Sequence, residues 1–213
     1  MEQLRGIAFI GGAGPQPEQC GSLSGGADLI VAADSGLVAA EAAGIWPDWI
    51  LGDMDSLDDP GRLDKYPPER VLRYAVDKDY TDTELALRLL WEKGACETWL
   101  IGGGGGRTDH LFALRSLFER EQCPDRWLTG AEDIRCLFMQ HELRCTLPPE
   151  SLVSVFPLGP GPWNVESQGL KWPLNGLTWD RGFFGISNIS LTGAFSMYAH
   201  AGRFLVILPL TVV

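Results

Sequence analysis

The sequence predicts an α/β N-terminal domain with a mostly parallel sheet, followed by a small all-β C-terminal domain that is either a sandwich or an open barrel. Short apolar runs alternate with helical patterns over roughly the first 130 residues, which is typical of βαβ units. After about Thr129 the chain is rich in Trp, Pro and Gly, and turn residues separate its short apolar runs without a long helical pattern. We therefore expect one domain over residues 1–130 and a second over residues 131–213.

Four apolar runs in the N-terminal part predict strands, and each run ends in glycines or aspartates. The predicted strands are residues 6–10, 28–33, 49–51 and 97–101. Because ligands bind at the carboxyl ends of strands in open α/β sheets, the motifs that follow these strands are expected to converge in space. The C-terminal part has comparable runs at residues 152–156 and 204–208, which we expect to form strands of the β domain.

The helical pattern is clearest after residue 81. Thr81 and Glu84 have the spacing of a capping box. The apolar stripe of this helix consists of Leu85, Ala86, Leu89 and Leu90. A helix of small residues is expected between residues 36 and 44, and a further helix is expected to begin at about Asp109.

The bulk composition argues against several classes of protein. A formal net charge of −11 disfavours a nucleic-acid binder, because no basic stripe is available to meet a phosphate backbone. Residues 1–5 lack the pattern of a signal peptide, and no apolar run reaches the length of a membrane span. The five cysteines are scattered without a Cys-x-x-Cys pair, so we expect reduced thiols in a cytoplasmic protein. The three histidines lack the spacing of a zinc site.

Two aspartate clusters are the most informative feature of the chain. The first contains Asp53 and Asp55 and follows a predicted strand, and the second contains Asp79 and Asp82 and opens the capped helix. Neighbouring aspartates repel one another, so a fold that gathers them needs a cation, and hard oxygen-bound ions such as Mg²⁺ are the usual choice. Solvated turn residues are the alternative, since Asp is common in turns. The presence of two clusters favours a site for Mg²⁺ and phosphate.

A glycine-rich loop is the third motif. Residues 102–106 are all glycine, which lets backbone N–H groups approach a phosphate, and Arg107 adds a planar charged fork. Neither the Walker nor the Rossmann spacing is present, and a flexible connector with a surface arginine is the alternative. We assign Arg107, Asp109 and His110 to the ATP side of a site, together with Asp34, which follows another strand. We interpret His110 as a structural residue at the start of a helix in preference to a general base.

Two segments of the β domain form a fourth candidate. Trp172 lies between a lysine and a proline, where it would either pack in the core or present its face to a flat, cationic heterocycle. Ser187 and Asn188 offer donors and acceptors to the edge of a ring. The residue types alone leave packing and binding equally open.

Taken in order along the chain, these motifs resemble those of a known family. They read Gly-Asp-Met-Asp-Ser, Lys-Asp-Tyr-Thr-Asp-Thr-Glu-Leu-Ala-Leu, Gly-Gly-Arg-Thr-Asp-His, Gly-Leu-Lys-Trp-Pro-Leu and Gly-Ile-Ser-Asn. Together they resemble the thiamine pyrophosphokinase (thiamine diphosphokinase) family over nearly the whole chain. The two aspartate motifs and the Gly-Gly-Arg-x-Asp-His motif are specific in combination, whereas the C-terminal motifs are weaker singly.

The resemblance implies a catalytic N-terminal domain, a β domain that helps to bind thiamine, and a homodimer with active sites at the subunit interface. It also implies transfer of the β,γ-diphosphate of ATP to the hydroxyl of thiamine, with release of AMP. By the same resemblance, the carboxylates that handle Mg²⁺ are Asp53, Asp55, Asp79 and Asp82. Arg107 and Asp109 would serve the nucleotide, and Trp172, Ser187 and Asn188 would contact thiamine from the partner subunit.

The chain departs from the family pattern in three places, the last of which is a pair of residues. Met54 stands where a Phe is usual between the first two aspartates, which is an apolar replacement of little consequence. Leu114 replaces a frequent Asn, which puts a polar contact there in doubt. Ile189 and Ser190 follow Asn188 in place of an acidic and an aromatic residue, which weakens the transfer of the thiamine contacts.

Two other functions fit the same motifs. One is a diphosphokinase for another flat heterocyclic alcohol, such as a hydroxymethylpterin, in which only the pocket of the β domain would differ. The other is a non-catalytic sensor of nucleotide or thiamine. The intact aspartate pairs argue against a sensor, because a sensor has no need of a full set of metal ligands.

Overall fold

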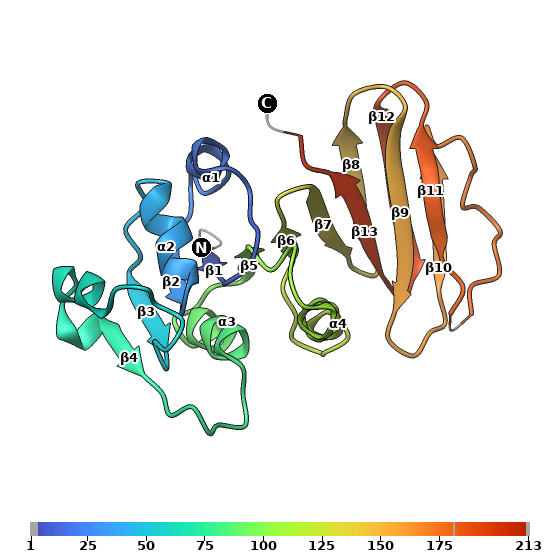
Figure 1. The fold of residues 1–213 in the computed structure, drawn as a ribbon. Coiled ribbons are helices and arrows are strands. Elements are labelled where there is room, and N and C mark those ends of the chain that lie inside the picture. The colour runs from blue at the N-terminus through green and yellow to red at the C-terminus, as the bar shows by residue number, and fades with distance from the viewer. Residues whose placement is uncertain (1–3, 181, 212–213) are drawn as a thin grey trace. The chain divides into compact units, whose positions relative to one another are not determined.

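The computed structural model describes residues 4–180 and 182–211. These residues form two compact units, which are Met1–Leu111 with Trp127–Ala131, and Phe112–Arg126 with Glu132–Val213 (Figure 1). Residues 1–3, at the end expected to lack a signal peptide, lie outside the described part. No helix in the described ranges has the length and apolar character needed to span a membrane.

The first unit is built on a parallel sheet. Its strands are β1 (Arg5–Phe9), β2 (Leu29–Ala33), β3 (Trp49–Gly52), β4 (Val71–Arg73), β5 (Glu97–Ile101) and β6 (Arg126–Leu128). They lie in the order β6-β5-β1-β2-β3-β4, and the pairs from β5 through β1, β2 and β3 to β4 are parallel. Ile7 in the middle of β1 lies opposite Ile30 on one side and Trp99 on the other. The predicted parallel α/β sheet is therefore confirmed.

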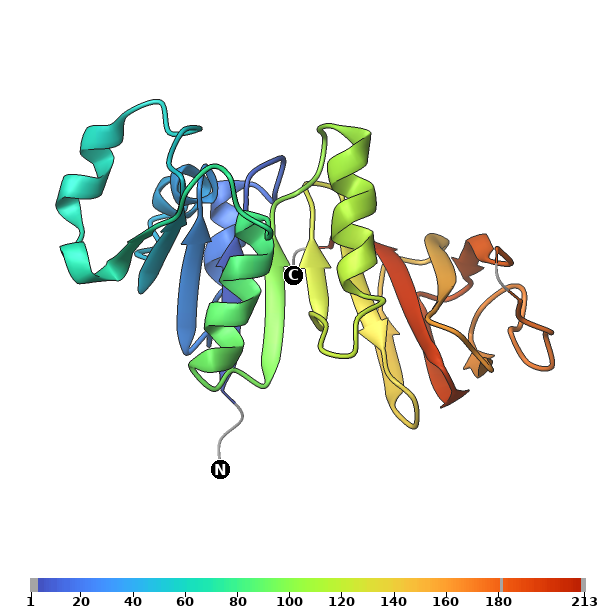
Figure 2. The ribbon, with the colours of Figure 1, turned by 90° about the horizontal axis from the view of Figure 1, so that it is seen from below.

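Helices cover both faces of this sheet (Figure 2). They are α1 (Pro17–Leu23), α2 (Gly36–Ala42), α3 (Asp82–Glu92) and the 3₁₀ turns η1 (Pro60–Lys65) and η2 (Pro68–Arg70), while α4 (Thr108–Leu117) begins in this unit. The chain moves from β1 to β2 to β3 in one direction and returns from β4 to β5 in the other. Right-handed crossovers therefore put α1 and α2 on one face and α3 on the opposite face.

This reversal creates a switch point between β1 and β5, where neighbouring strands send their following loops to opposite faces. Ligands of open α/β sheets bind at such points, outside the carboxyl ends of the strands. The glycine-rich loops after β1 and after β5 meet there, since Ala13 and Gly104 form an isolated antiparallel bridge. The topology thus brings to one edge the motifs that the sequence placed after separate strands.

The second unit is a β-sandwich. One antiparallel sheet has the order β11 (Gly185–Ser190), β9 (Ser151–Leu158), β13 (Arg203–Pro209) and β7 (Glu132–Leu137). The other has the order β10 (Asn164–Gln168), β12 (Ala194–Ala201) and β8 (Glu142–Thr146). One buried cluster joins side chains of both sheets, among them Val155, Phe204, Phe195 and Met197. Of the two predicted arrangements, sandwich and open barrel, the structure therefore has the sandwich.

Candidate metal and phosphate site

Three carboxylates lie together at the carboxyl ends of β2 and β3. Asp34 directly follows β2, and Asp53 and Asp55 follow β3, which pairs with β2 in parallel. One carboxylate oxygen of each residue lies within 4.8 Å of the others. The proximity follows from the topology, because parallel neighbours end at the same edge of a sheet. The sequence predicted Asp53 and Asp55 as metal ligands and Asp34 on the ATP side, and the structure brings the three into one acidic cluster.

The backbone of the acidic cluster is held in unusual conformations. Asp34 has φ 54° and Met54 has φ 65°, which is the left-handed region that non-glycine residues seldom occupy. Met54 is buried in the core beneath this edge together with Ile50 and Leu63, so packing holds the turn that separates Asp53 from Asp55. Such strain persists only where the surroundings enforce it, and it is concentrated at functional sites.

Lys78 provides a built-in cation beside the acidic cluster. Its Nζ lies 3.1 Å from Asp53 Oδ2 and 3.2 Å from Asp82 Oδ1, and its side chain is only 15% exposed. Asp82 is the first residue of α3, where the capping box between Thr81 and Glu84 is confirmed. Burial opposes the charge of Lys78, but its bonds to Asp53 and Asp82 raise its pKa. The role of Lys78 was missed from the sequence, because Lys78 precedes α3 and no helical spacing relates it to Asp82.

The carboxylates of the acidic cluster differ in their proton affinity. Burial raises the pKa of Asp34, and the hydrogen bond from Ser56 Oγ to Asp34 Oδ2 at 2.5 Å opposes this shift. The backbone N–H of Asp55, 3.2 Å from Asp53 Oδ1, is the first cause that lowers the pKa of Asp53, and Lys78 adds to it. The pKa of Asp55 is raised, chiefly by its side-chain hydrogen bond with Asp53. The single positive charge of Lys78 therefore compensates only part of the negative charge of the acidic cluster.

The acidic cluster fits a hard divalent cation. Asp34 Oδ1 is buried and has no hydrogen-bond partner among the described residues, which leaves one oxygen of the cluster available to an ion. Carboxylate oxygens are the ligands that Mg²⁺ prefers. Of the other two predicted ligands, Asp82 reaches Asp53 through Lys78, and Asp79 is exposed and lies outside the group of three.

The glycine loop after β5 is tied to the loop after β1. Gly103 N donates to Gly11 O at 2.9 Å, and Ala13 and Gly104 exchange two backbone bonds of 2.7 and 2.9 Å. A Cβ at Gly102 would lie 2.2 Å from Ile10 O, so only glycine allows this approach. The amides of Gly103 and Gly104 therefore join the two loops, and the amide of Gly102 donates to Leu128 O at 2.9 Å. The amides that could contact a phosphate are those from Gly105 onward.

Arg107, Asp109 and His110 form an exposed group at the start of α4. Arg107 donates to both oxygens of Asp109 at 3.1 and 2.5 Å, and these side chains are 73% and 60% exposed. This pairing raises the pKa of Arg107 and lowers that of Asp109. The backbone N–H of His110 donates to Asp109 Oδ1 at 3.1 Å. The guanidinium is therefore oriented by Asp109 while it stays open to an incoming anion.

Trp172, Ser187 and Asn188 lie together in the second unit. Trp172 is 53% exposed, with the Lys171 ammonium 4.6 Å from the centre of its ring, so it is not a core residue. Asn188 is buried, accepts from Trp172 N at 3.1 Å and donates to Trp172 O at 2.7 Å. Its amide is thus engaged in holding the Trp172 backbone. Ser187 is exposed at φ 58°, and its N–H donates to Ser154 Oγ at 3.2 Å.

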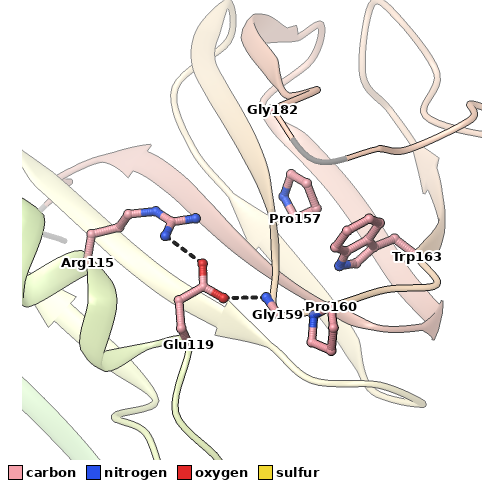
Figure 3. A pocket seen from close by; sticks show the side chains of 7 residues that line it. All are labelled: Arg115, Glu119, Pro157, Gly159, Pro160, Trp163 and Gly182. Atoms are coloured by element: carbon pink, nitrogen blue, oxygen red, sulfur yellow. Dashed lines mark hydrogen bonds and ion pairs between the residues drawn. The ribbon is translucent and has the colours of Figure 1, made fainter.

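A cavity of about 340 Å³ also lies in the second unit (Figure 3). Its lining is Arg115, Glu119, Pro157, Gly159, Pro160, Trp163 and Gly182. The carboxylate of Glu119 already accepts from Arg115 at 2.5 Å and from the N–H of Gly159, as the dashed lines in Figure 3 show. None of the predicted site residues lines this cavity. Its two charged side chains, Arg115 and Glu119, already pair with each other, so the cavity does not suit a metal and phosphate.

Comparison with family models gives two matches along the chain. Residues 20–124 match the model described as "Thiamin pyrophosphokinase, catalytic domain". Residues 140–196 match the model described as "Thiamin pyrophosphokinase, vitamin B1 binding domain". A curated relative, the thiamine pyrophosphokinase of Bacillus subtilis (strain 168), is 28% identical over 159 residues, which cover 69% of this chain and 71% of that protein.

Solved structures with the same fold come from bacteria and a yeast. The thiamine pyrophosphokinase of Bacillus subtilis superposes with a TM-score of 0.80 at 24% identity, covering 97% of this chain and 100% of that one. The enzyme of Geobacillus thermodenitrificans gives a TM-score of 0.75 at 25% identity, with coverage of 97% and 98%. The enzyme of Candida albicans gives 0.73 at 16% identity, with coverage of 99% and 90%.

Proposed function

The chain belongs to the thiamine pyrophosphokinase family of enzymes, and from this premise we propose that it transfers the diphosphate group of ATP to the hydroxyl of thiamine, giving thiamine diphosphate and AMP. One observation carries the proposal beyond family membership. It is the acidic cluster of Asp34, Asp53 and Asp55, which includes a buried oxygen without a partner among the described residues and lies within the part that matches the catalytic model.

We assign Mg²⁺ to the acidic cluster, with Asp79 and Asp82 as further carboxylates from the start of α3. When bound, the ion would neutralise charge on the phosphate oxygens and help to align them, which is the usual contribution of a metal to phosphoryl transfer. Lys78 holds Asp53 and Asp82 in place and supplies positive charge beside the transferring group. The exposed guanidinium of Arg107 provides a fork for phosphate oxygens, and Asp109 orients it.

The acceptor hydroxyl needs only a nearby carboxylate to take its proton late in the transfer. We propose that one of the aspartates of the site that is not fully engaged by metal receives this proton.

The thiamine contacts are proposed for the second unit. Thiamine is a cation with a flat pyrimidine ring, so its pocket should combine an aromatic face with a few polar groups. Trp172 offers an exposed aromatic face, Ser187 an exposed hydroxyl, and Asn188 fixes the backbone of Trp172. In keeping with the family resemblance, we propose a homodimer in which these residues serve the partner's active site. The five free thiols fit the reducing cytoplasm, where we place the protein.

A single assay tests the proposed reaction. AMP release from ATP is measured with thiamine, with a hydroxymethylpterin and with no acceptor, in the presence of Mg²⁺. We expect acceptor-dependent AMP release with thiamine alone. Release only with the pterin would reassign the acceptor. Equal release in all three reactions, or none in any, would refute transfer to thiamine.

A further inference from the structure

Two of the five cysteines form a contacting pair in the second unit. Cys123 lies in the connection after α4, and Cys136 lies in β7, where its backbone N–H donates to Asp125 O at 2.8 Å. This backbone bond brings the two segments together, and the thiols hydrogen-bond to each other. Cys123 is 7% exposed, whereas Cys136 is partly exposed, so solvent meets the pair at the Cys136 side.

An arginine completes the group. Leu205 in β13 lies opposite Cys136, and because alternate residues of a strand share a face, Arg203 lies on the same face as Cys136. Its Nη1 lies 3.2 Å from Cys123 Sγ. The guanidinium is held by the carbonyl oxygens of Arg120 at 2.8 Å and Glu119 at 3.2 Å. A fixed positive charge therefore points at a sulfur that has a second thiol beside it.

The electrostatics distinguish the two sulfurs. The hydrogen bond from Cys136 is the largest cause that lowers the pKa of Cys123, and Arg203 assists it against the cost of burial. The same hydrogen bond raises the pKa of Cys136. Cys145 is a useful contrast, since Arg135 lies 3.7 Å from its sulfur but burial raises its pKa. Thiolate character is thus directed to Cys123, and Cys136 is the protonated neighbour.

We propose that Cys123 and Cys136, with Arg203, form a reversible oxidation site for a small hydroperoxide such as hydrogen peroxide. The Cys123 thiolate, whose proton has passed to solvent, attacks one peroxide oxygen, so an S–O bond forms, the O–O bond breaks, and the hydroxide that leaves takes up a proton from solvent as water. Cys136 sulfur then attacks the resulting sulfenic acid, forming an S–S bond as the S–O bond breaks. The proton of Cys136 leaves with the oxygen as water. The peroxide is reduced to water, the two thiols are oxidised to a disulfide, and an added dithiol restores them.

The site differs from that of an isolated exposed thiol. Cys96 is the exposed cysteine, and its sulfur lies 3.6 Å from the carbonyl oxygen of Leu4. Oxidation there would stop at sulfenic acid or proceed to higher acids, because no other described thiol pairs with it. The neighbouring thiol at position 136 allows Cys123 to be trapped as a disulfide before it is oxidised further.

The test uses the full chain treated with hydrogen peroxide, followed by alkylation of the remaining thiols and peptide mass spectrometry without reduction. We expect a cross-linked peptide pair joining Cys123 and Cys136, with the mass lowered by two hydrogens, and its disappearance after dithiothreitol. Cys96→Ser should form the cross-link as fast as the unaltered chain. In Cys136→Ser, Cys123 should instead accumulate sulfenic and sulfinic acids.

Arg203→Gln tests the electrostatic part of the proposal. The variant should form the cross-link several-fold more slowly, whereas Arg135→Gln, beside the protonated Cys145, should leave the rate unchanged. Circular dichroism confirms that each variant is folded before its rate is measured. Alkylated Cys123 and Cys136 in the peroxide-treated chain, or oxidation of Cys123 to sulfinic acid without the cross-link, would overturn the assignment.

Discussion

At the scale of single residues, charge governs the acidic cluster. Asp34, Asp53 and Asp55 are held together by the strand ends and by a strained turn, and Lys78 compensates only part of their charge. Their like charges repel in the absence of metal, so the cluster is maintained at a cost to stability. Such an arrangement is expected where the charge serves binding or catalysis.

Asp55→Asn removes one of the three carboxylates. We expect turnover to fall by orders of magnitude, because the proposed metal site loses one of its charged carboxylate ligands. The melting temperature without metal should be unchanged or slightly higher, since one repulsive charge is removed. AMP release and thermal unfolding measure the two effects. Asp58→Asn is the matched control, as Asp58 is exposed on the same loop outside the acidic cluster, and normal activity in Asp55→Asn would contradict the metal assignment.

Arg107→Lys retains a positive charge but loses the planar fork that Asp109 orients. A lysine ammonium does not form the bidentate contact with phosphate, so we expect a higher KM for ATP and slower transfer. The KM for thiamine should change little. Steady-state kinetics with each substrate varied in turn measures these constants. Unaltered kinetics would mean that the loop is a simple connector.

At the scale of elements, the site depends on how α3 meets the sheet. The capping box positions Asp82 at the first residue of α3, and Lys78 joins it to Asp53 at the end of β3. A loop residue thus links a helix N-terminus to a strand end. These side chains are 12–22% exposed, so the ion pairs are stronger than those of a fully solvated surface.

Lys78→Gln removes this link. Without metal, the variant should lose about 1–3 kcal/mol of unfolding free energy, the scale of a hydrogen bond to a charged group that is left unpaired. Added Mg²⁺ should raise the melting temperature of the variant more than that of the unaltered chain, because the acidic cluster then lacks its own cation. Lys65→Gln serves as the control, since Lys65 lies in η1, outside the acidic cluster. Equal Mg²⁺ effects in the two chains would argue against a shared role of lysine and metal.

The position of Trp172 also depends on a second element. The side chain of Asn188 on β11 hydrogen-bonds to the backbone of Trp172. Trp172→Ala should weaken thiamine binding by about 1–3 kcal/mol, the scale of one aromatic stack, while ATP binding stays the same. Its melting temperature should change little, as the side chain is half-exposed. Calorimetric titration and thermal unfolding measure both. Full thiamine affinity in a destabilised Trp172→Ala would remove Trp172 from the site.

At the scale of the whole molecule, one buried carboxylate makes the stability of the fold depend on pH in the acid range. Asp133 is buried in β7 and accepts from Arg126 at 2.6 and 2.7 Å and from Arg135 at 2.7 and 3.0 Å. Desolvation opposes its ionisation, but the two arginines outweigh burial and lower the pKa of Asp133. A lowered pKa contributes stability that is present above the unfolded-state value of about 3.9 and is lost as the pH falls through the folded-state value.

Asp133→Asn should therefore destabilise the second unit by about 3–5 kcal/mol at neutral pH, because two partly buried arginines lose the buried carboxylate that both of them bind. The difference from the unaltered chain should shrink as the pH falls below 4, where the carboxylate takes up a proton on unfolding. Urea unfolding between pH 3 and 7 gives both curves. A difference that is independent of pH would show that the charge of Asp133 does not contribute.

The sequence by itself determined the features that depend on local pattern. Short apolar runs that end in glycine or aspartate predicted β1, β2, β3 and β5, and the capping box predicted the start of α3, because these signals lie within one element. The motifs were likewise readable in order, and they resembled the family to which the chain belongs. Short or irregular elements such as α1, β4 and β6 were not predicted, since their few residues form neither a clear apolar run nor a helical pattern.

Only the tertiary structure decided how these pieces meet. It joined Asp34 to Asp53 and Asp55, placed Lys78 between Asp53 and Asp82, and chose the sandwich over the open barrel. It also showed that the side-chain amide of Asn188 hydrogen-bonds to the backbone of Trp172. These relations depend on strand order, register and side-chain direction across long separations in sequence. A local sequence pattern predicts on which side of a helix or strand a residue lies. It does not predict which residue, distant in the sequence, that side chain will contact.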